Sequence, residues 1–187
     1  MVRGNHLKEY RKDNRMKRII IIGSGGAGKS TLARKLGELT NLPVIHLDSV
    51  FWKPYWTPTP KDEWTKSVAE IISAEKWIVD GNFGSTMDIR IQRADTIILL
   101  DLPPMVCVYS VVKRVLKHRN KTRPDMGADC PEKADLEFLK WVWNFRRKSL
   151  PTVLRKLEET EGKTIIRLKS RREMDLFLKE LEKNKKM

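Results

Sequence analysis

Short apolar runs alternate along this chain with longer segments in which apolar residues recur every three or four positions. The apolar runs predict five strands, at residues 17–22, 44–47, 77–79, 96–100 and 163–168. The longer segments predict helices over about 29–39, 60–72, 86–93, 104–117, 132–147 and 151–157, with a last helix after Ser170. Buried-type strands that alternate with helices are typical of a parallel sheet covered by helices on both faces. We therefore expect an α/β protein built in three layers.

Two of the predicted helices begin with recognisable capping residues. Thr59 can cap a helix whose first residue is Pro60, because a hydroxyl accepts from free backbone N–H groups and proline suits the first helical position. Ser170 and Glu173 have the spacing of a capping box. The sequence thus predicts helix starts near residues 60 and 171.

The connection between the first strand and the first helix carries the clearest chemistry. It reads Gly-Ser-Gly-Gly-Ala-Gly-Lys-Ser, the G-x-x-x-x-G-K-[ST] spacing of a phosphate-binding P-loop. Glycines let successive N–H groups face one concavity, and the following helix adds its free N–H groups and positive dipole end. Lys29 would reach the β- and γ-phosphates of a nucleotide, and Ser30 would bind Mg²⁺. The predicted nucleotide contacts are Gly23, Ser24, Gly25, Gly26, Ala27, Gly28, Lys29, Ser30 and Thr31.

An aspartate follows each of three predicted strands, at Asp48, Asp80 and Asp101. Ligands of parallel sheets bind at the carboxyl ends of the strands, so these carboxylates are expected beside the P-loop. An acid in this position also commonly stabilises a turn. Asp80 is the better outer partner for Mg²⁺, with Asp101 the second choice, whereas Asp48 could orient or deprotonate an acceptor hydroxyl.

Basic residues concentrate between positions 113 and 123, in a stretch that contains no acid and leads into a loop with proline and glycine. Guanidinium groups bind phosphate oxygens at two points, which a lysine cannot do. We expect a lid-like segment at about 118–133 that directs Arg119 and Arg123 at the phosphates. Arg146, near the end of the next helix, could point into the same space. A solvated basic helix end is the alternative.

The segment Phe51-Trp52-Lys53-Pro54-Tyr55-Trp56 supports two interpretations. Its rings could stack on a ring-bearing acceptor, or they could fill the core beneath a long connection. The sequence does not choose between them. His46 and His118 are too isolated to be named as ligands.

Composition narrows the class of protein. The chain has 187 residues, of which 40% are hydrophobic and 33% charged, as expected of one soluble domain. Cys107 and Cys130 have no familiar metal-ligand spacing, and a reducing cytoplasm suits them better than a disulfide framework. No apolar run is long enough for a membrane span, and no secretory signal is recognisable. We therefore expect a cytoplasmic protein with no membrane partner.

The formal net charge of +14 would attract nucleic acid, phosphorylated ligands and anionic membranes. Part of this excess lies in residues 1–16, which we interpret as a basic tail before a compact domain at residues 17–187. The tail is either a loosely held extension or a contact for nucleic acid.

These motifs resemble the adenylate kinase group of small P-loop kinases. The resemblance rests on the P-loop, on Val79-Asp80-Gly81 and Leu100-Asp101-Leu102-Pro103, and on Arg114 and Arg119. Four further segments, at residues 46–52, 80–84, 121–126 and 141–145, resemble the adenylate-kinase-like DNA topology modulation proteins. The similarity covers about residues 17–182.

The resemblance implies an ATP-binding P-loop NTPase fold with sheet order 2-3-1-4-5. It implies that Asp80 is the Walker B acid, that Arg119 and Arg123 belong to the lid, and that Arg114 lies near the adenine. The turn at Lys169-Ser170 would border the same adenine.

The chain also differs from adenylate kinases. It has Asp80-Gly81-Asn82-Phe83-Gly84 where they have Asp-Gly-Phe-Pro-Arg, so that arginine is missing and Arg90 is the nearest candidate to replace it. Asp48 instead resembles the acceptor-binding acid of shikimate- and nucleoside-type kinases.

Two functions follow from the sequence. The leading one is a Mg²⁺·ATP-dependent kinase that phosphorylates a small-molecule hydroxyl or phosphate acceptor, such as a nucleoside, nucleotide or metabolite. Its catalytic residues would be Lys29, Asp48, Arg119, Arg123 and Arg146. The alternative is a nucleic-acid-associated ATP-binding protein or ATPase, in which ATP acts as a switch and DNA binding falls steeply with salt.

Overall fold

The computed structural model describes residues 16–119, 121–123, 125–132 and 135–185. The predicted basic tail therefore lies outside the described residues, except for Met16, which packs against the core. No helix in these ranges is both long and apolar enough to cross a membrane.

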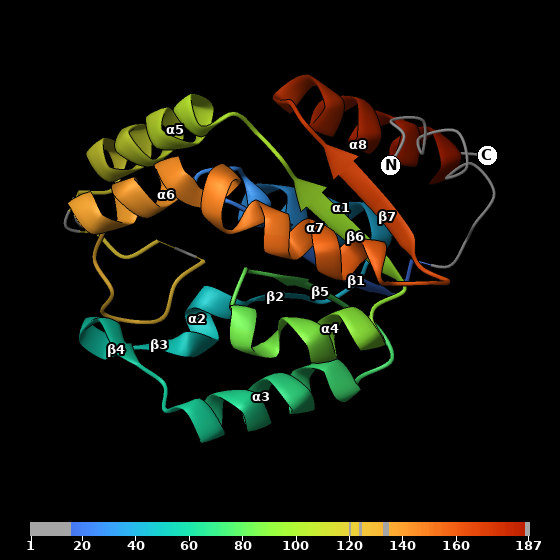
Figure 1. The fold of residues 1–187 in the computed structure, drawn as a ribbon, viewed down its shortest axis with the longest axis horizontal. Helices are drawn as coiled ribbons and strands as arrows, with labels where there is room; N and C mark the ends of the chain where they lie inside the picture. Colours follow the sequence, from blue (N-terminus) through green and yellow to red (C-terminus); the bar gives the residue numbers. More distant parts are fainter. Residues whose placement is uncertain (1–15, 120, 124, 133–134, 186–187) are drawn as a thin grey trace.

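A parallel sheet forms the middle layer of the described structure (Figure 1). Its five strands are, in spatial order, β2 (Val44–His46), β5 (Trp77–Asp80), β1 (Arg18–Gly23), β6 (Thr96–Leu100) and β7 (Thr164–Leu168). All their pairings are parallel. Numbered along the chain, this order is 2-3-1-4-5, so the predicted α/β fold and strand order are confirmed.

The alternation of side chains along β1 divides the core into two halves. Ile19 and Ile21 belong to one half and Ile20 and Ile22 to the other, and all four are fully buried. The first half is covered by α1 (Lys29–Thr40), α5 (Pro104–Lys117) and α8 (Arg171–Lys185). The second is covered by α3 (Lys61–Ser73), α4 (Met87–Arg93) and α7 (Leu150–Glu158). Figure 1 shows α3 and α4 on one side of the sheet and α5 and α8 on the other.

The helix α6 (Leu136–Lys148) packs against both halves of the core. Its Val142 contributes to the first half and its Phe145 to the second. The predicted start near residue 132 is wrong, because Asp135 Oδ1 accepts from the backbone N–H groups of Glu137 (2.9 Å) and Phe138 (3.0 Å) and caps the helix there. Glu132 lies outside the helix and forms an isolated β-bridge with Arg119.

Two other predicted boundaries differ from the structure. Thr59 does not cap α3; its hydroxyl donates to the Phe51 carbonyl oxygen at 2.7 Å. The second strand ends at His46, so Asp48 lies in the first turn of a short helix, α2 (Leu47–Phe51), rather than at a strand end. The predicted capping chemistry of α8 is present, because Ser170 Oγ accepts from the Glu173 backbone N–H at 3.2 Å.

The aromatic segment forms a small hairpin, and its rings divide between the core and the wall of a cavity. It comprises β3 (Trp52–Lys53), the 3-10 turn η2 (Pro54–Trp56) and β4 (Thr57–Pro58), with β3 and β4 antiparallel. Phe51, just before it, packs its ring against Trp64 at 5.0 Å between centroids and so fills the core. Trp52 and Trp56 instead line the cavity described below.

Candidate active site

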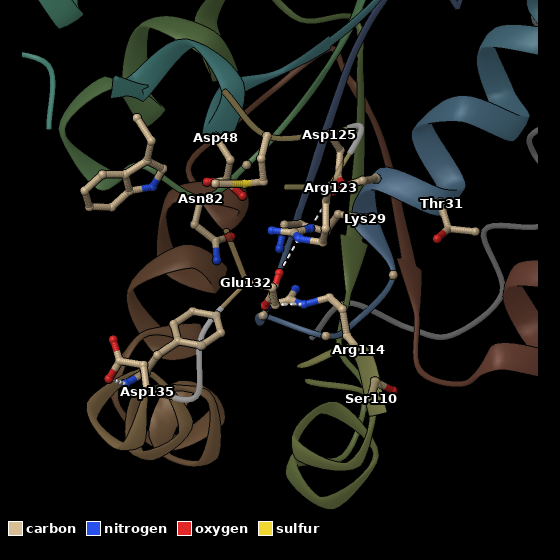
Figure 2. A pocket seen from close by; sticks show the side chains of 18 of the residues that line it. Lys29, Thr31, Asp48, Asn82, Ser110, Arg114, Arg123, Asp125, Glu132 and Asp135 are labelled. Carbon is tan, nitrogen blue, oxygen red and sulfur yellow. Dashed lines mark hydrogen bonds and ion pairs between the residues drawn. The ribbon is translucent and has the colours of Figure 1, made fainter. Parts of the chain in front are cut away.

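A cavity of about 730 Å³ lies where the P-loop meets α2, α5, α6, the hairpin and the loop that follows α5. Its walls come from segments far apart in the sequence: Gly25, Gly26, Gly28, Lys29, Ser30, Thr31, Asp48, Trp52, Trp56, Gly81, Asn82, Phe83, Ser110, Arg114, Arg123, Asp125, Met126, Glu132, Asp135, Phe138, Trp141 and Arg171. Figure 2 shows Asp48 and Asn82 on one side, Thr31 and Ser110 on the other, and Arg123 between them. The size is typical of a small-molecule site.

The P-loop has the geometry that its glycines predict. Gly26 and Gly28 adopt positive φ angles of 73° and 95°, a region that favours glycine. Gly25 lies against α6, where an added Cβ would come within 2.6 Å of the Phe138 side chain. The helix α1 begins at Lys29, so its free N–H groups face the loop. The segment therefore forms an anion site between strand and helix.

Lys29 and Asp48 act on each other inside the cavity. Burial lowers the pKa of Lys29, and the nearby carboxylates of Asp48 and Asp80 oppose that effect. Burial likewise raises the pKa of Asp48, against the influence of Lys29. The Lys29 ammonium donates to the Ser24 carbonyl oxygen at 3.0 Å. A lysine and a poorly solvated carboxylate thus lie together beside the phosphate loop.

Asp80 is buried and held by a histidine. His46 Nδ1 and Asp80 Oδ1 are 2.6 Å apart. Burial acts to lower the pKa of His46, but the hydrogen bond and charge of Asp80 outweigh it, and the pKa lies above the ordinary histidine value. The sequence indicated no partner for His46, because the two residues are 34 positions apart and meet only through the pairing of β2 with β5.

The donor set around Ser30 suits Mg²⁺. Among the described residues, no group of three or more His, Cys, Asp or Glu side chains is placed to bind a metal ion. Mg²⁺ at nucleotide sites needs only one or two protein ligands, since phosphates and waters complete its shell. Ser30, with Asp80 as an outer partner, meets that requirement. Burial acts to raise the pKa of Asp125. The charge of Arg123 and a hydrogen bond with Ser30 outweigh burial, so the pKa of Asp125 lies below its ordinary value.

Two arginines of the cavity share one buried acid. Glu132 Oε1 lies 2.8 Å from Arg114 Nη2, and Glu132 Oε2 lies 2.5 Å from Arg123 Nε. Arg123 Nη1 also pairs with Asp125 Oδ2 at 2.8 Å. Figure 2 shows Glu132 between the two guanidinium groups. The lid-like segment thus contributes Glu132 as the charge partner of two arginines. The sequence did not indicate this pairing, because it predicted that Glu132 begins a helix.

Contacts join the lid-like segment to the hairpin. The Tyr55 backbone N–H donates to the Asp129 carbonyl oxygen at 3.0 Å, and Trp56 Nε1 donates to the Pro131 carbonyl oxygen at 3.1 Å. Cys130 Sγ contacts the Lys53 carbonyl oxygen at 3.3 Å. These segments, about 75 residues apart in the chain, therefore form one wall of the cavity.

Three arginines suggested by the sequence lie elsewhere. Arg146 Nε is 3.3 Å from Asp101 Oδ1, and that buried carboxylate also pairs with Arg167. Arg119 is exposed and, like Arg146 and Asp101, is not among the described residues that line the cavity. Arg90 is fully buried with its donors on backbone carbonyls, so it cannot supply the arginine missing after Gly81.

Arg171 is a cavity residue that the sequence did not single out. Its Nη2 donates to the Gly26 carbonyl oxygen at 3.0 Å and to Ser110 Oγ at 3.2 Å. The turn at 169–170, which the resemblance places beside the adenine, ends one residue before Arg171. This position was the signal in the sequence that could have indicated Arg171. Arg114 lies nearby, with its guanidinium carbon 5.9 Å from the Phe138 ring centroid. These groups line the side of the cavity where the resemblance would place the base of a nucleotide.

Known structures share this fold. Shikimate kinase from Bacteroides thetaiotaomicron aligns over 91% of this chain and 99% of its own, with a TM-score of 0.54 and 16% identity. A candidate kinase from Chloroflexus aurantiacus aligns over the same shares with a TM-score of 0.51 and 16% identity. A gluconokinase from Sinorhizobium meliloti aligns over 91% and 92%, with a TM-score of 0.49 and 16% identity. No family model and no curated protein matches the chain.

At these identities the likeness establishes the fold, a three-layer α/β fold that the chain shares with shikimate kinase. It identifies no narrower family.

Proposed function

We propose that this protein is a kinase that transfers the γ-phosphoryl group of Mg²⁺·ATP to a hydroxyl group of a small molecule. The observation that carries the proposal is a single cavity that contains the P-loop Lys29 and Ser30, the carboxylate of Asp48 and the guanidinium of Arg123. Phosphoryl transfer needs these parts: cations around the phosphates, a metal ligand, and an acid that orients the acceptor.

ATP would place its phosphates on the N–H groups of residues 25–30 and its base near Arg114 and Arg171. Lys29 neutralises charge on the β- and γ-phosphates, and Arg123 does so from the opposite wall. Ser30, with Asp80 as an outer partner, would hold Mg²⁺, and the ion would supply positive charge that stabilises the phosphates.

Asp48 acts on the acceptor. The acceptor oxygen forms a bond to the γ-phosphorus while the bond from that phosphorus to the bridging oxygen of ADP breaks. The hydroxyl proton passes to the Asp48 carboxylate. A raised pKa makes Asp48 a stronger base than an exposed aspartate, which favours this transfer. Arg119 and Arg146 have no part in this mechanism, since neither lines the cavity.

The deciding experiment measures ATP turnover by the full chain with Mg²⁺. The protein is assayed alone, with pooled nucleosides, nucleotides and hydroxylated metabolites, and with DNA. We expect ADP formation to need an acceptor and a phosphorylated product to appear by mass spectrometry. ATP hydrolysis that DNA alone stimulates would contradict the proposal and favour the nucleic-acid-associated ATPase.

Two substitutions separate the assigned roles. Lys29→Ala is expected to lower kcat by roughly 100-fold or more, because a preorganised cation is lost. Asp48→Asn is expected to lower kcat by roughly 100-fold or more while ATP affinity, measured by calorimetry, changes by less than about threefold. Asp175→Asn, at an exposed position of α8, is the control. An Asp48→Asn variant with the wild-type rate would remove Asp48 from the mechanism.

A further inference from the structure

The cations of the cavity have hydrogen-bond or ion-pair partners other than Asp48, although the charges of Lys29 and Arg123 oppose the rise in its pKa and both are assigned to the ATP phosphates under the proposed function. The described lining residues include four, Lys29, Arg114, Arg123 and Arg171. Lys29 and Arg171 bind P-loop carbonyl oxygens, and Arg114 and Arg123 are paired with Glu132. Figure 2 shows Arg123 and Arg114 directed at Glu132, while Asp48 lies on another side of the cavity.

The wall around Asp48 is made of rings and a thioether. The Trp52 backbone N–H donates to the Asp48 carbonyl oxygen at the end of α2, so the two residues are one helical turn apart, and both line the cavity. Trp52 and Trp56 have ring centroids 5.6 Å apart. Phe83 and Met126 complete this wall, and Met126 is held there because Gly127 lies directly against the Trp52 backbone. This part of the cavity therefore offers apolar faces together with the carboxylates of Asp48 and Asp125.

The other polar groups near this wall already have partners. Asn82 Oδ1 accepts from the Gly23 N–H at 3.0 Å, and Asn82 Nδ2 donates to the Gly23 carbonyl oxygen at 2.7 Å. Arg90 lies behind the wall and binds the carbonyl oxygens of Gly81 at 2.9 Å and of Phe83 at 2.9 Å. The donors of Arg90 are thus bound to backbone carbonyl oxygens, whereas Asn82 lines the cavity and keeps one amide N–H that could donate to a neutral acceptor.

We propose that the acceptor is an uncharged alcohol carried on a flat ring, of about the size of a nucleoside, and that anionic acceptors are rejected. This inference rests on the proposed kinase function. A carboxylate or phosphate on the acceptor would lose its hydration beside Asp48 and Asp125 without gaining a cation. A cationic acceptor would meet the four cations of the other walls. A neutral ring gains the faces of Trp52 and Trp56, and its hydroxyl donates to Asp48.

The test uses pairs of acceptors in which one member carries an added anionic group and both keep a free primary or ring hydroxyl. The full chain is assayed with Mg²⁺·ATP and adenosine or its 3′-monophosphate, thymidine or its 3′-monophosphate, and methyl shikimate or shikimate. The kcat/KM for ADP formation is measured, and each product is identified by mass spectrometry. In the reacting pair we expect the uncharged member to be favoured by roughly 100-fold, because an unpaired like charge costs that much. Equal or better use of the anionic member overturns the proposal.

Binding separates failure of this inference from failure of the kinase proposal. Mg²⁺·ATP that binds by calorimetry, with no uncharged ring alcohol bound or phosphorylated, overturns the acceptor class and leaves the nucleotide site. Absence of Mg²⁺·ATP binding removes the kinase proposal itself.

Two pairs of variants test the wall directly. Met126→Lys adds a cation to the cavity wall and is expected to reduce discrimination against the anionic member at least tenfold. Met126→Gln, of similar length and uncharged, is expected to keep that discrimination.

Trp52→Leu removes a stacking face and is expected to raise the acceptor KM roughly tenfold with little change in the KM for ATP. Trp52→Phe is expected to restore most of the loss. Unchanged discrimination in Met126→Lys together with an unchanged acceptor KM in Trp52→Leu overturns the proposal.

Discussion

The burial that would make Asp48 a better base in the proposed reaction also lowers the stability of the folded protein. The carboxylate lies in a poorly solvated cavity wall, which raises its pKa and makes it a better base. The same lack of solvation penalises its charged form in the folded protein. Residues of this kind are expected to cost stability where they supply function.

We predict that Asp48→Asn stabilises the protein at pH 7. In the unfolded chain an aspartate ionises near pH 4, whereas the folded carboxyl holds its proton to higher pH. Wild-type stability therefore falls as pH rises between these two values, and the full penalty remains above them. The advantage of Asp48→Asn in urea unfolding should be greater at pH 7 than near pH 4. Asp175→Asn should show no such trend, and an Asp48→Asn variant less stable than the wild type at pH 7 would contradict the explanation.

Glu132 is expected to hold the two cavity arginines together. In Glu132→Gln, Arg114 and Arg123 lose their shared charge partner, and we predict a loss of about 2 kcal/mol in unfolding free energy, since both guanidinium groups are largely buried. Glu70→Gln, at an exposed position of α3, is the control for replacing an acid. The measurement is urea unfolding without nucleotide, and equal stability of the two variants would show that the triad adds nothing.

At the scale of elements, the connection from β5 to α4 shows how one side chain can organise a loop. Arg90, in α4, donates to the carbonyl oxygens of Asn82 at 2.7 Å and of Thr86 at 3.3 Å, as well as to the two described above. Burial lowers its pKa to about 10, so the group stays charged at neutral pH. It fixes the backbone that carries Phe83, whose φ of 20° lies in an unusual region.

Arg90→Lys should therefore be costly although the charge is kept. An ammonium cannot reach carbonyl oxygens on both sides of the turn, and each charged hydrogen bond lost costs about 1.5 to 3 kcal/mol. We predict a loss of about 2 to 3 kcal/mol in unfolding free energy and a higher KM for the acceptor. Arg34→Lys, at an exposed position of α1, is the control and should lose less than about 1 kcal/mol. Similar losses in the two variants would argue against this role of Arg90.

At the scale of the whole molecule, the three layers bring every proposed functional group to the carboxyl edge of one sheet. β1 supplies the P-loop, β2 leads to α2, and β5 leads to the Asn82 turn. The loop after α5 and the hairpin join above them. A ligand in this cavity would contact α1, α2, α5, α6, α8 and the hairpin, so its binding should stabilise the fold as a unit.

Mg²⁺·ATP is accordingly expected to raise the melting temperature. A nucleotide at 100 times its Kd stabilises by about 2.7 kcal/mol, which for a chain of this size corresponds to about 5 to 10 °C. Most of this shift should be absent in Lys29→Ala and smaller when EDTA removes Mg²⁺. Differential scanning fluorimetry measures it, and a larger shift with DNA at physiological salt would favour the nucleic-acid alternative.

The strands, most helices and the P-loop could be predicted from the sequence pattern alone. The sheet order could be predicted only through the resemblance. These features depend on neighbouring residues: a period of two buries both faces of β1, and eight consecutive residues form the phosphate loop.

Only the tertiary structure decided which side chains meet. Arg146 pairs with Asp101 instead of facing the cavity, Glu132 joins Arg114 and Arg123, and the aromatic segment divides between core and cavity wall. These outcomes depend on where helices and loops cross and on how buried charges find partners, and both link residues far apart in the chain. Local pattern sets the elements, whereas the pairing of buried polar groups across elements sets the site.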